Sequence, residues 1–108
     1  MQATQKYIRT SPRKLRLVAD AVRGLRADKA LEYLHFLGKR AGLPVAKVIR
    51  SATASARLEQ NLDAKDLKVK IIDVGEGPTY KRWRAVSRGS AHSIMKRTSH
   101  IKVILEKN

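Results

Sequence analysis

The sequence contains no cysteine in its 108 residues. Disulfide bonds and thiolate metal sites are therefore excluded, and the absence is consistent with a reducing compartment. Long apolar runs are also lacking, because no run exceeds three residues. We therefore expect no segment that spans a bilayer, no signal-peptide core and no membrane partner.

Acidic residues are few and unevenly placed. Asp and Glu total 9 against 24 Lys and Arg, which gives a formal charge of +15 at pH 7. No acid occurs between Glu76 and Glu106. A chain with this charge repels itself unless anions screen it, and this favours a nucleic acid or an anionic surface as the partner.

Patterns that would support catalysis or metal binding are missing as well. The three histidines, His35, His92 and His100, have no cysteine partners and no H-x-x-x-H spacing. The acids are scattered, none lies in the basic segment, and no G-x-x-x-x-G-K-[ST] phosphate loop occurs. We expect no enzyme activity, no metal and no cofactor.

Three segments with apolar residues at helical spacing predict helices. The first opens with Ser11 as N-cap and Pro12 at the first helical position, and Gly24 stops it. The second covers about Asp28–Leu37 and ends at Gly38. The third begins at Pro44, with Asn61 as its C-cap. In the second helix Tyr33 and Phe36 are expected in the core or at its rim, and His35 is expected to be partly buried.

Strands are predicted before and after these helices. The candidates are Ala3–Arg9, Leu67–Val74 and His100–Glu106. The alternation in Leu67–Val74 changes phase at Ile72, which predicts a bulge or twist where the chain leaves the body. The element order predicts an α+β fold with three helices packed on a small antiparallel sheet and a long protruding β-hairpin. We expect a single domain, 1–108, in which 1–74 and 100–108 form the body and 75–99 the basic hairpin.

The basic hairpin has too few large apolar residues to bury itself, only Trp83, Val86, Ile94 and Met95. Two arms of about 12 residues would reach about 40 Å, whereas a compact chain of this length has a radius of gyration of about 13 Å. The segment is therefore either a disordered basic loop or an arm that a polyanion orders.

Candidate RNA-binding residues occur in two places. In the hairpin, Tyr80 and Trp83 alternate with cations, a pattern in which rings stack on unpaired bases and cations bind phosphates; alternatively, Trp83 packs on an arginine of its own hairpin. In the first helix, three cations crowd the first turn, where they oppose the helix dipole, and this favours a phosphate-binding role. The candidates are Lys6, Arg9, Arg13, Lys14, Arg16, Lys81, Arg82, Arg84, Arg88, Lys96, Arg97 and His100.

Several motifs resemble, in order, the L-twenty-two family of large-subunit ribosomal proteins. They are Ser11-Pro12-Arg13-Lys14-Leu15-Arg16-Leu17-Val18-Ala19-Asp20, Val22-Arg23-Gly24, Asp66-Leu67-Lys68-Val69, Glu76-Gly77-Pro78, Lys81-Arg82 and Lys96-Arg97-Thr98-Ser99-His100-Ile101. The similarity covers nearly the whole chain and is of the bacterial or organellar type. It implies a structural protein of the large subunit that binds ribosomal RNA and supports assembly, in the cytoplasmic or an organellar ribosome. Neighbouring ribosomal proteins would be further partners, and no homo-oligomer is expected.

The resemblance also implies that the hairpin threads into the subunit and that its tip lines the peptide exit tunnel, where it meets the nascent peptide. The tunnel residues would be Tyr80, Lys81, Arg82, Trp83, Arg84, Val86, Ser87, Arg88, Gly89 and Ser90. Val86 and Ser90 stand where the family usually has arginine, and Ser55 stands where its third helix usually has asparagine. Two other readings of the sequence are a free-standing nucleic-acid architectural protein and an enzyme acting on RNA.

Overall fold

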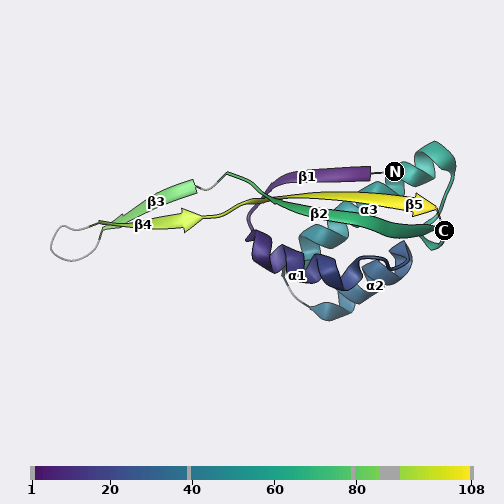
Figure 1. Cartoon of the computed structure of the whole chain (residues 1–108), viewed down its shortest axis with the longest axis horizontal. Coiled ribbons are helices and arrows are strands. Elements are labelled where there is room, and N and C mark those ends of the chain that lie inside the picture. Colours follow the sequence, from purple (N-terminus) through teal and green to yellow (C-terminus); the bar gives the residue numbers. More distant parts are fainter. Residues whose placement is uncertain (1, 39, 79, 86–90, 108) are drawn as a thin grey trace.

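The computed structural model describes residues 2–38, 40–78, 80–85 and 91–107, with 80–85 and 91–96 described by their backbone (Figure 1). The molecule is elongated, with principal extents of 62 × 26 × 16 Å. Its radius of gyration is 16.9 Å, compared with about 13 Å for a compact chain of this length. The extra length comes from a hairpin that projects from a body of helices and strands.

The predicted α+β class and element order are confirmed. The elements are β1 (Gln2–Ile8), α1 (Pro12–Val22), α2 (Ala27–Leu37), α3 (Gly42–Gln60), the short 3₁₀ turn η1 (Ala64–Asp66), β2 (Leu67–Glu76), β3 (Tyr80–Ala85), β4 (Ala91–Lys96) and β5 (Ser99–Lys107). Their ends lie within a few residues of those predicted. Helix α3 starts two residues before Pro44, which is possible because a proline in the first turn removes no helical hydrogen bond. Strand β2 continues two residues beyond its predicted end at Val74.

The body sheet has the order β1-β5-β2, with the last strand of the chain in the centre. Both pairings are antiparallel, with Ala3 opposite Val103 and Val74 opposite Ile101. The predicted bulge in β2 is present, but its position was predicted wrongly. It lies between Val69 and Ile71, in the middle of the sheet, and pairing with β5 continues to Glu76. The bulge lets Val69 and Ile72 both face the core.

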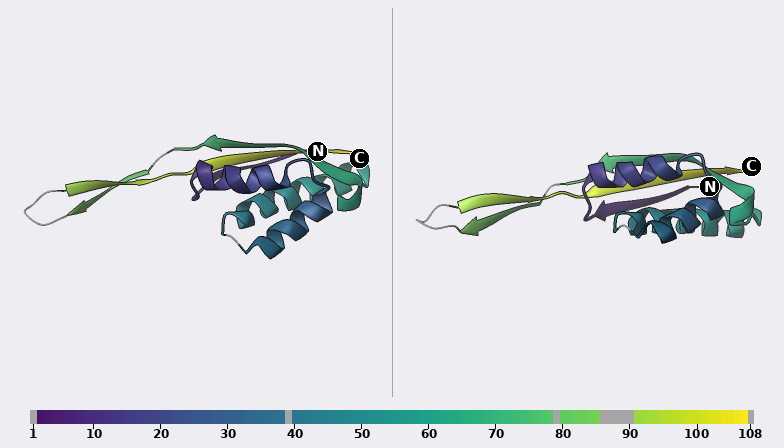
Figure 2. Two further views of the ribbon diagram at one scale, coloured as in Figure 1. Left: turned by 60° about the horizontal axis from the view of Figure 1, so that its bottom comes forward. Right: turned by 90° about the horizontal axis from the view of Figure 1, so that it is seen from below.

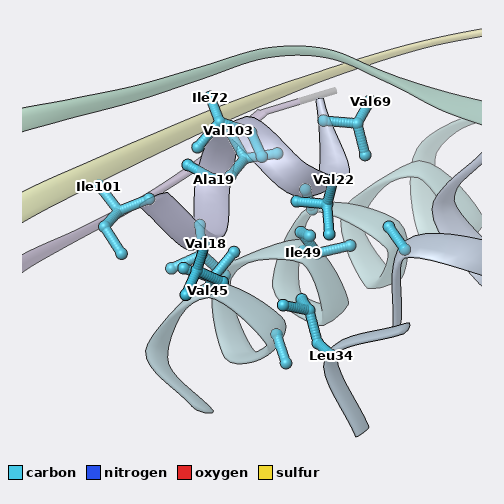
Figure 3. Packing of buried hydrophobic residues seen from close by; sticks show 14 of the residues in the cluster. Val18, Ala19, Val22, Leu34, Val45, Ile49, Val69, Ile72, Ile101 and Val103 are labelled. Atoms are coloured by element: carbon cyan, nitrogen blue, oxygen red, sulfur yellow. The ribbon is translucent and has the colours of Figure 1, made fainter. Parts of the chain in front are cut away.

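The hydrophobic core lies between the sheet and the helices (Figure 2). Helix α1 packs over β2, whereas α3 crosses β1 and β5. Figure 3 shows side chains from both layers meeting there. Fully buried members include Leu15, Val22, Val45, Ile49, Val69, Ile101 and Val103. This core fixes both strands from which the hairpin extends.

The predictions for the aromatic residues of α2 were partly wrong. Phe36 is 78% exposed, Tyr33 is 42% exposed, and His35 is exposed rather than partly buried. Helix α2 packs mainly on α3, so one narrow stripe of it is covered. Ala27, Ala30 and Leu34 occupy that stripe. Phe36 instead contacts His35 edge to face, with ring centroids 5.3 Å apart.

Candidate nucleic-acid interface

The cations at the start of α1 have different surroundings. Arg13 and Lys14 are exposed to solvent. Arg16, which the sequence also indicated for phosphate binding, donates from Nη2 to the backbone oxygen of Val74 at 3.2 Å. These three cations therefore do not form one uniform phosphate-binding cluster, because Arg16 also hydrogen-bonds to the backbone of β2.

Arg23, about two turns further along at the C-cap of α1, also binds the backbone of β2. Arg23 donates from Nη2 to the oxygen of Ile72 at 2.9 Å and forms an ion pair with Asp20. Further along the same edge, the Val69 amide donates to the Leu25 oxygen at 2.9 Å. The outer edge of β2 thus has partners for several backbone groups that an edge strand would otherwise leave open.

Polar groups join the two arms at the root of the hairpin and tie the root to the body. The sequence patterns predicted no role for these groups. Ser99 is fully buried, and its hydroxyl donates to the Thr10 oxygen at 2.6 Å. Thr98 is 2% exposed and donates to the Pro78 oxygen at 2.5 Å. The Gly77 amide donates to the Thr98 oxygen at 2.9 Å. The sequence feature that could have identified these residues was their position where the basic hairpin meets the predicted strand His100–Glu106.

Gly77 also allows the two arms to approach closely. A Cβ atom at this position would lie 2.5 Å from Oγ1 of Thr98 and 3.0 Å from Cε1 of His100. Real Cβ atoms are essentially never that close to another heavy atom. Glycine is therefore required here for packing, since its φ is not in the left-handed region.

His100 lies between the hairpin root and β1. Its Nδ1 accepts a hydrogen bond from the Tyr7 amide at 3.1 Å. The two rings are edge to face, 5.3 Å apart at an angle of 88°. His100 was predicted to bind RNA, and the structure shows it positioning Tyr7, which is 58% exposed. Lys6, Arg9 and Arg97 are exposed at this end of the body.

The hairpin forms a second, two-stranded sheet beyond the body (Figure 1). Its backbone register runs from Tyr80 opposite Lys96 to Ala85 opposite Ala91. Five predicted tunnel residues, Tyr80, Lys81, Arg82, Trp83 and Arg84, therefore lie in β3. The other five, Val86, Ser87, Arg88, Gly89 and Ser90, lie outside the described residues.

Acidic residues gather at the end of the body that is remote from the hairpin. Five of the nine lie at the start of α2, the end of α3, in or beside η1, or at the end of β5: Asp28, Glu59, Asp63, Asp66 and Glu106. Some pair with local cations, such as Glu106 with Lys68 at 3.7 Å. The hydrogen bond from Arg26 lowers the pKa of Asp28. Positive charge is thus left unbalanced mainly toward the hairpin.

Residues 3–106 match the sequence model of a family described as ribosomal protein L22p/L17e. The chain belongs to this family. Membership makes it a structural protein of the large ribosomal subunit rather than an enzyme, located in the ribosome in the cytoplasm.

Similar proteins from bacteria cover almost the same length. The large ribosomal subunit protein uL22 of Syntrophus aciditrophicus is 53% identical over 105 residues, which are 97% of this chain and 96% of that protein. The uL22 of Desulfotalea psychrophila is 47% identical over 107 residues, 99% of this chain and 97% of the relative. The uL22 of Desulfatibacillum aliphaticivorans is 46% identical over 106 residues, covering 98% and 97%.

Two structural findings accompany this assignment to the ribosomal family. No group of three or more His, Asp or Glu side chains within the described part of the chain is arranged to hold a metal ion. Likewise, none of the helices in the described ranges is long and apolar enough to cross a membrane.

Proposed function

We propose that this ribosomal protein binds large-subunit ribosomal RNA through one basic end of its body and through its hairpin, and that the hairpin helps to line the nascent-peptide exit tunnel. The observation that supports this most is the hairpin itself. It projects from a 62 Å molecule as a separate two-stranded sheet. Residues 77–105 carry no acidic side chain. An arm with this charge needs a polyanion around it.

The body contacts of the proposal lie at the hairpin end. Lys6, Arg9, Arg13, Lys14 and Arg97 are exposed there and would bind phosphates. Arg16 and His100 belong to the same surface, although each also makes a contact within the protein. The hairpin contacts would come from Lys81, Arg82, Arg84, Arg88 and Lys96.

The proposed tunnel contact concerns Tyr80–Arg84 in β3 and the residues numbered 86–90. A two-stranded ribbon is narrow enough to pass between RNA helices, and its cations would offset phosphate repulsion around a channel. Neighbouring large-subunit proteins would contact the remaining body surface. The arm would also support assembly by joining RNA segments that are otherwise separate.

Fractionation of a cell lysate in low salt tests whether the protein acts within the subunit. We expect most of the protein to sediment with large subunits, and RNA-specific nuclease to release it. A protein found mainly in the soluble fraction or on DNA would instead support the free-standing architectural protein. A large-subunit protein of unrelated structure in the same gradient serves as the internal control.

Deletion of Lys81, Arg82 and Trp83 tests the tunnel proposal. The change removes two charges and one large ring and shifts the strand register by an odd number, so that neighbouring side chains change face. We expect large subunits to assemble but to respond differently to macrolides that bind in the tunnel and to a stalling reporter peptide. Normal incorporation with unchanged stalling and drug response would leave a scaffold role alone. Deletion of three residues from the exposed end of α3, 58–60, is the matched control.

A further inference from the structure

We propose that Tyr7 is a stacking platform for one unpaired base of ribosomal RNA at the root of the hairpin. This inference rests on the proposed RNA-binding function and adds to it a residue and a ligand group, a nucleobase. Its basis is a combination of backbone strain, ring exposure and surrounding charge at one position of β1.

The backbone at Tyr7 is strained. Its φ is 60°, in the left-handed region, where a bulky residue is an outlier. Within the described residues, the other positions with positive φ are Asn61, Gly24 and Gly38, which are types that tolerate it. Tyr7 lies where the β1–β5 pairing is irregular, between Gln5 and Ile8. Such strain persists where surrounding contacts impose it, and it is concentrated at functional sites.

The strained backbone presents an open ring in a fixed orientation. The Tyr7 amide is bound to Nδ1 of His100, and the edge-to-face contact with the same imidazole limits rotation of the phenol ring. Even so, 58% of the residue remains exposed. The ring is thus held by a contact with one neighbour while much of the residue stays open to a ligand. Stacking on such rings is the usual way in which proteins bind unpaired bases.

The charge around the ring suits a nucleotide. Lys6 and Arg9 flank it in the chain and are exposed. Because Ile8 pairs with Ser99, exposed Arg97 belongs to the same end of the sheet. Glu76 at the end of β2 is outnumbered by these three cations. The phosphates on either side of a stacked base would therefore meet positive charge.

The test uses the full-length protein and two RNAs with equal numbers of phosphates, a ten-nucleotide oligouridine and the same backbone without bases. We expect the wild type to bind the oligouridine more tightly. Tyr7→Gly should lower affinity for oligouridine by about five- to hundred-and-fifty-fold, as for loss of one stacked base, and leave binding to the abasic RNA unchanged. Tyr7→Phe, which keeps a ring, should retain the preference, as should the control Tyr33→Ala on α2.

Tyr7→Gly also separates binding from folding, because glycine adopts positive φ without steric cost. Its melting temperature should be no lower than that of the wild type. A lower melting temperature with equal losses on both RNAs would show that Tyr7 is only a structural contact and would overturn the proposal. An unchanged preference for oligouridine in Tyr7→Gly would overturn it too.

The experiment distinguishes the absence of base stacking at Tyr7 from the absence of RNA binding by the whole protein. If the wild type binds both RNAs equally tightly and with steep salt dependence, Tyr7 does not stack on a base, and the proposed RNA-binding function still stands. Wild type that binds neither RNA would contradict both. In large subunits reconstituted with Tyr7→Gly, chemical probing should reveal one unpaired base with increased reactivity. If no base gains reactivity, the platform is not used in the ribosome.

Discussion

At the scale of single residues, Gly77 shows most directly how the hairpin root depends on close packing. Gly77→Ala would place a methyl group against the Thr98 hydroxyl and the His100 ring. Either the arms move apart or Thr98 gives up its bond to the Pro78 oxygen. We expect the free energy of unfolding to fall by about 1–3 kcal/mol, the usual cost of overpacking, as measured by urea denaturation.

Gly75→Ala provides the matched control two residues away. A Cβ atom at Gly75 would have no heavy atom within 4 Å. Because alanine also restricts the unfolded chain, this variant should be neutral or slightly more stable than the wild type. Equal stability of the Gly75→Ala and Gly77→Ala proteins would show that the two arms are not in close contact.

Residue-level predictions from the sequence succeeded where the cause is local. Ser11 and Pro12 open α1, and Gly38 and Asn61 end their helices, as predicted. Both end residues have left-handed backbone. Phe36 was misplaced because burial depends on which face of α2 has a neighbour. The role of Arg16 at the β2 edge was missed for a similar reason, since its contact with Val74 joins residues 58 positions apart.

At the scale of elements, the hairpin and the body should be separable. The ties at the root, from Ser99 to Thr10 and from Gly77 to Thr98, lie outside β3 and β4. Replacing residues 80–94 with Asn-Gly should therefore leave cooperative thermal unfolding and the far-ultraviolet signal of the helices. A broad, non-cooperative transition in this variant would show that the arm contributes to the core.

The order of the elements could be predicted from the sequence, but their pairing could not. Periodicity and capping residues are short-range signals, and they located each helix and body strand to within a few residues. The central place of β5 depends on contacts between β1 and β5 across most of the chain. The bulge was recognised from the phase change, yet its position was misjudged because β2 stays paired with β5 as far as Glu76.

At the scale of the whole molecule, RNA affinity should depend steeply on salt. Each phosphate that is neutralised adds about 0.7 to 0.9 to the slope of log affinity against log salt concentration. With about six contacts, the expected slope is roughly −4 to −5. Filter binding of the full chain to a ribosomal RNA fragment between low and moderate salt measures it.

Lys14→Gln is the matched variant for this measurement. Lys14 is exposed and lies outside the core, so its replacement should reduce the steepness by about one unit without changing the fold. A wild-type slope shallower than about −2 would be incompatible with phosphate binding as the main source of affinity.

The gathering of acids at the end remote from the hairpin has a consequence for how the protein meets its partner. Charge that differs between the two ends of a 62 Å molecule makes a large electric dipole along the long axis. In the field of a polyanion, this dipole experiences a torque before any contact is made. The protein should therefore approach RNA with the hairpin leading, so the end that we propose enters the subunit arrives first. The acidic residues would then contribute to assembly kinetics without touching RNA.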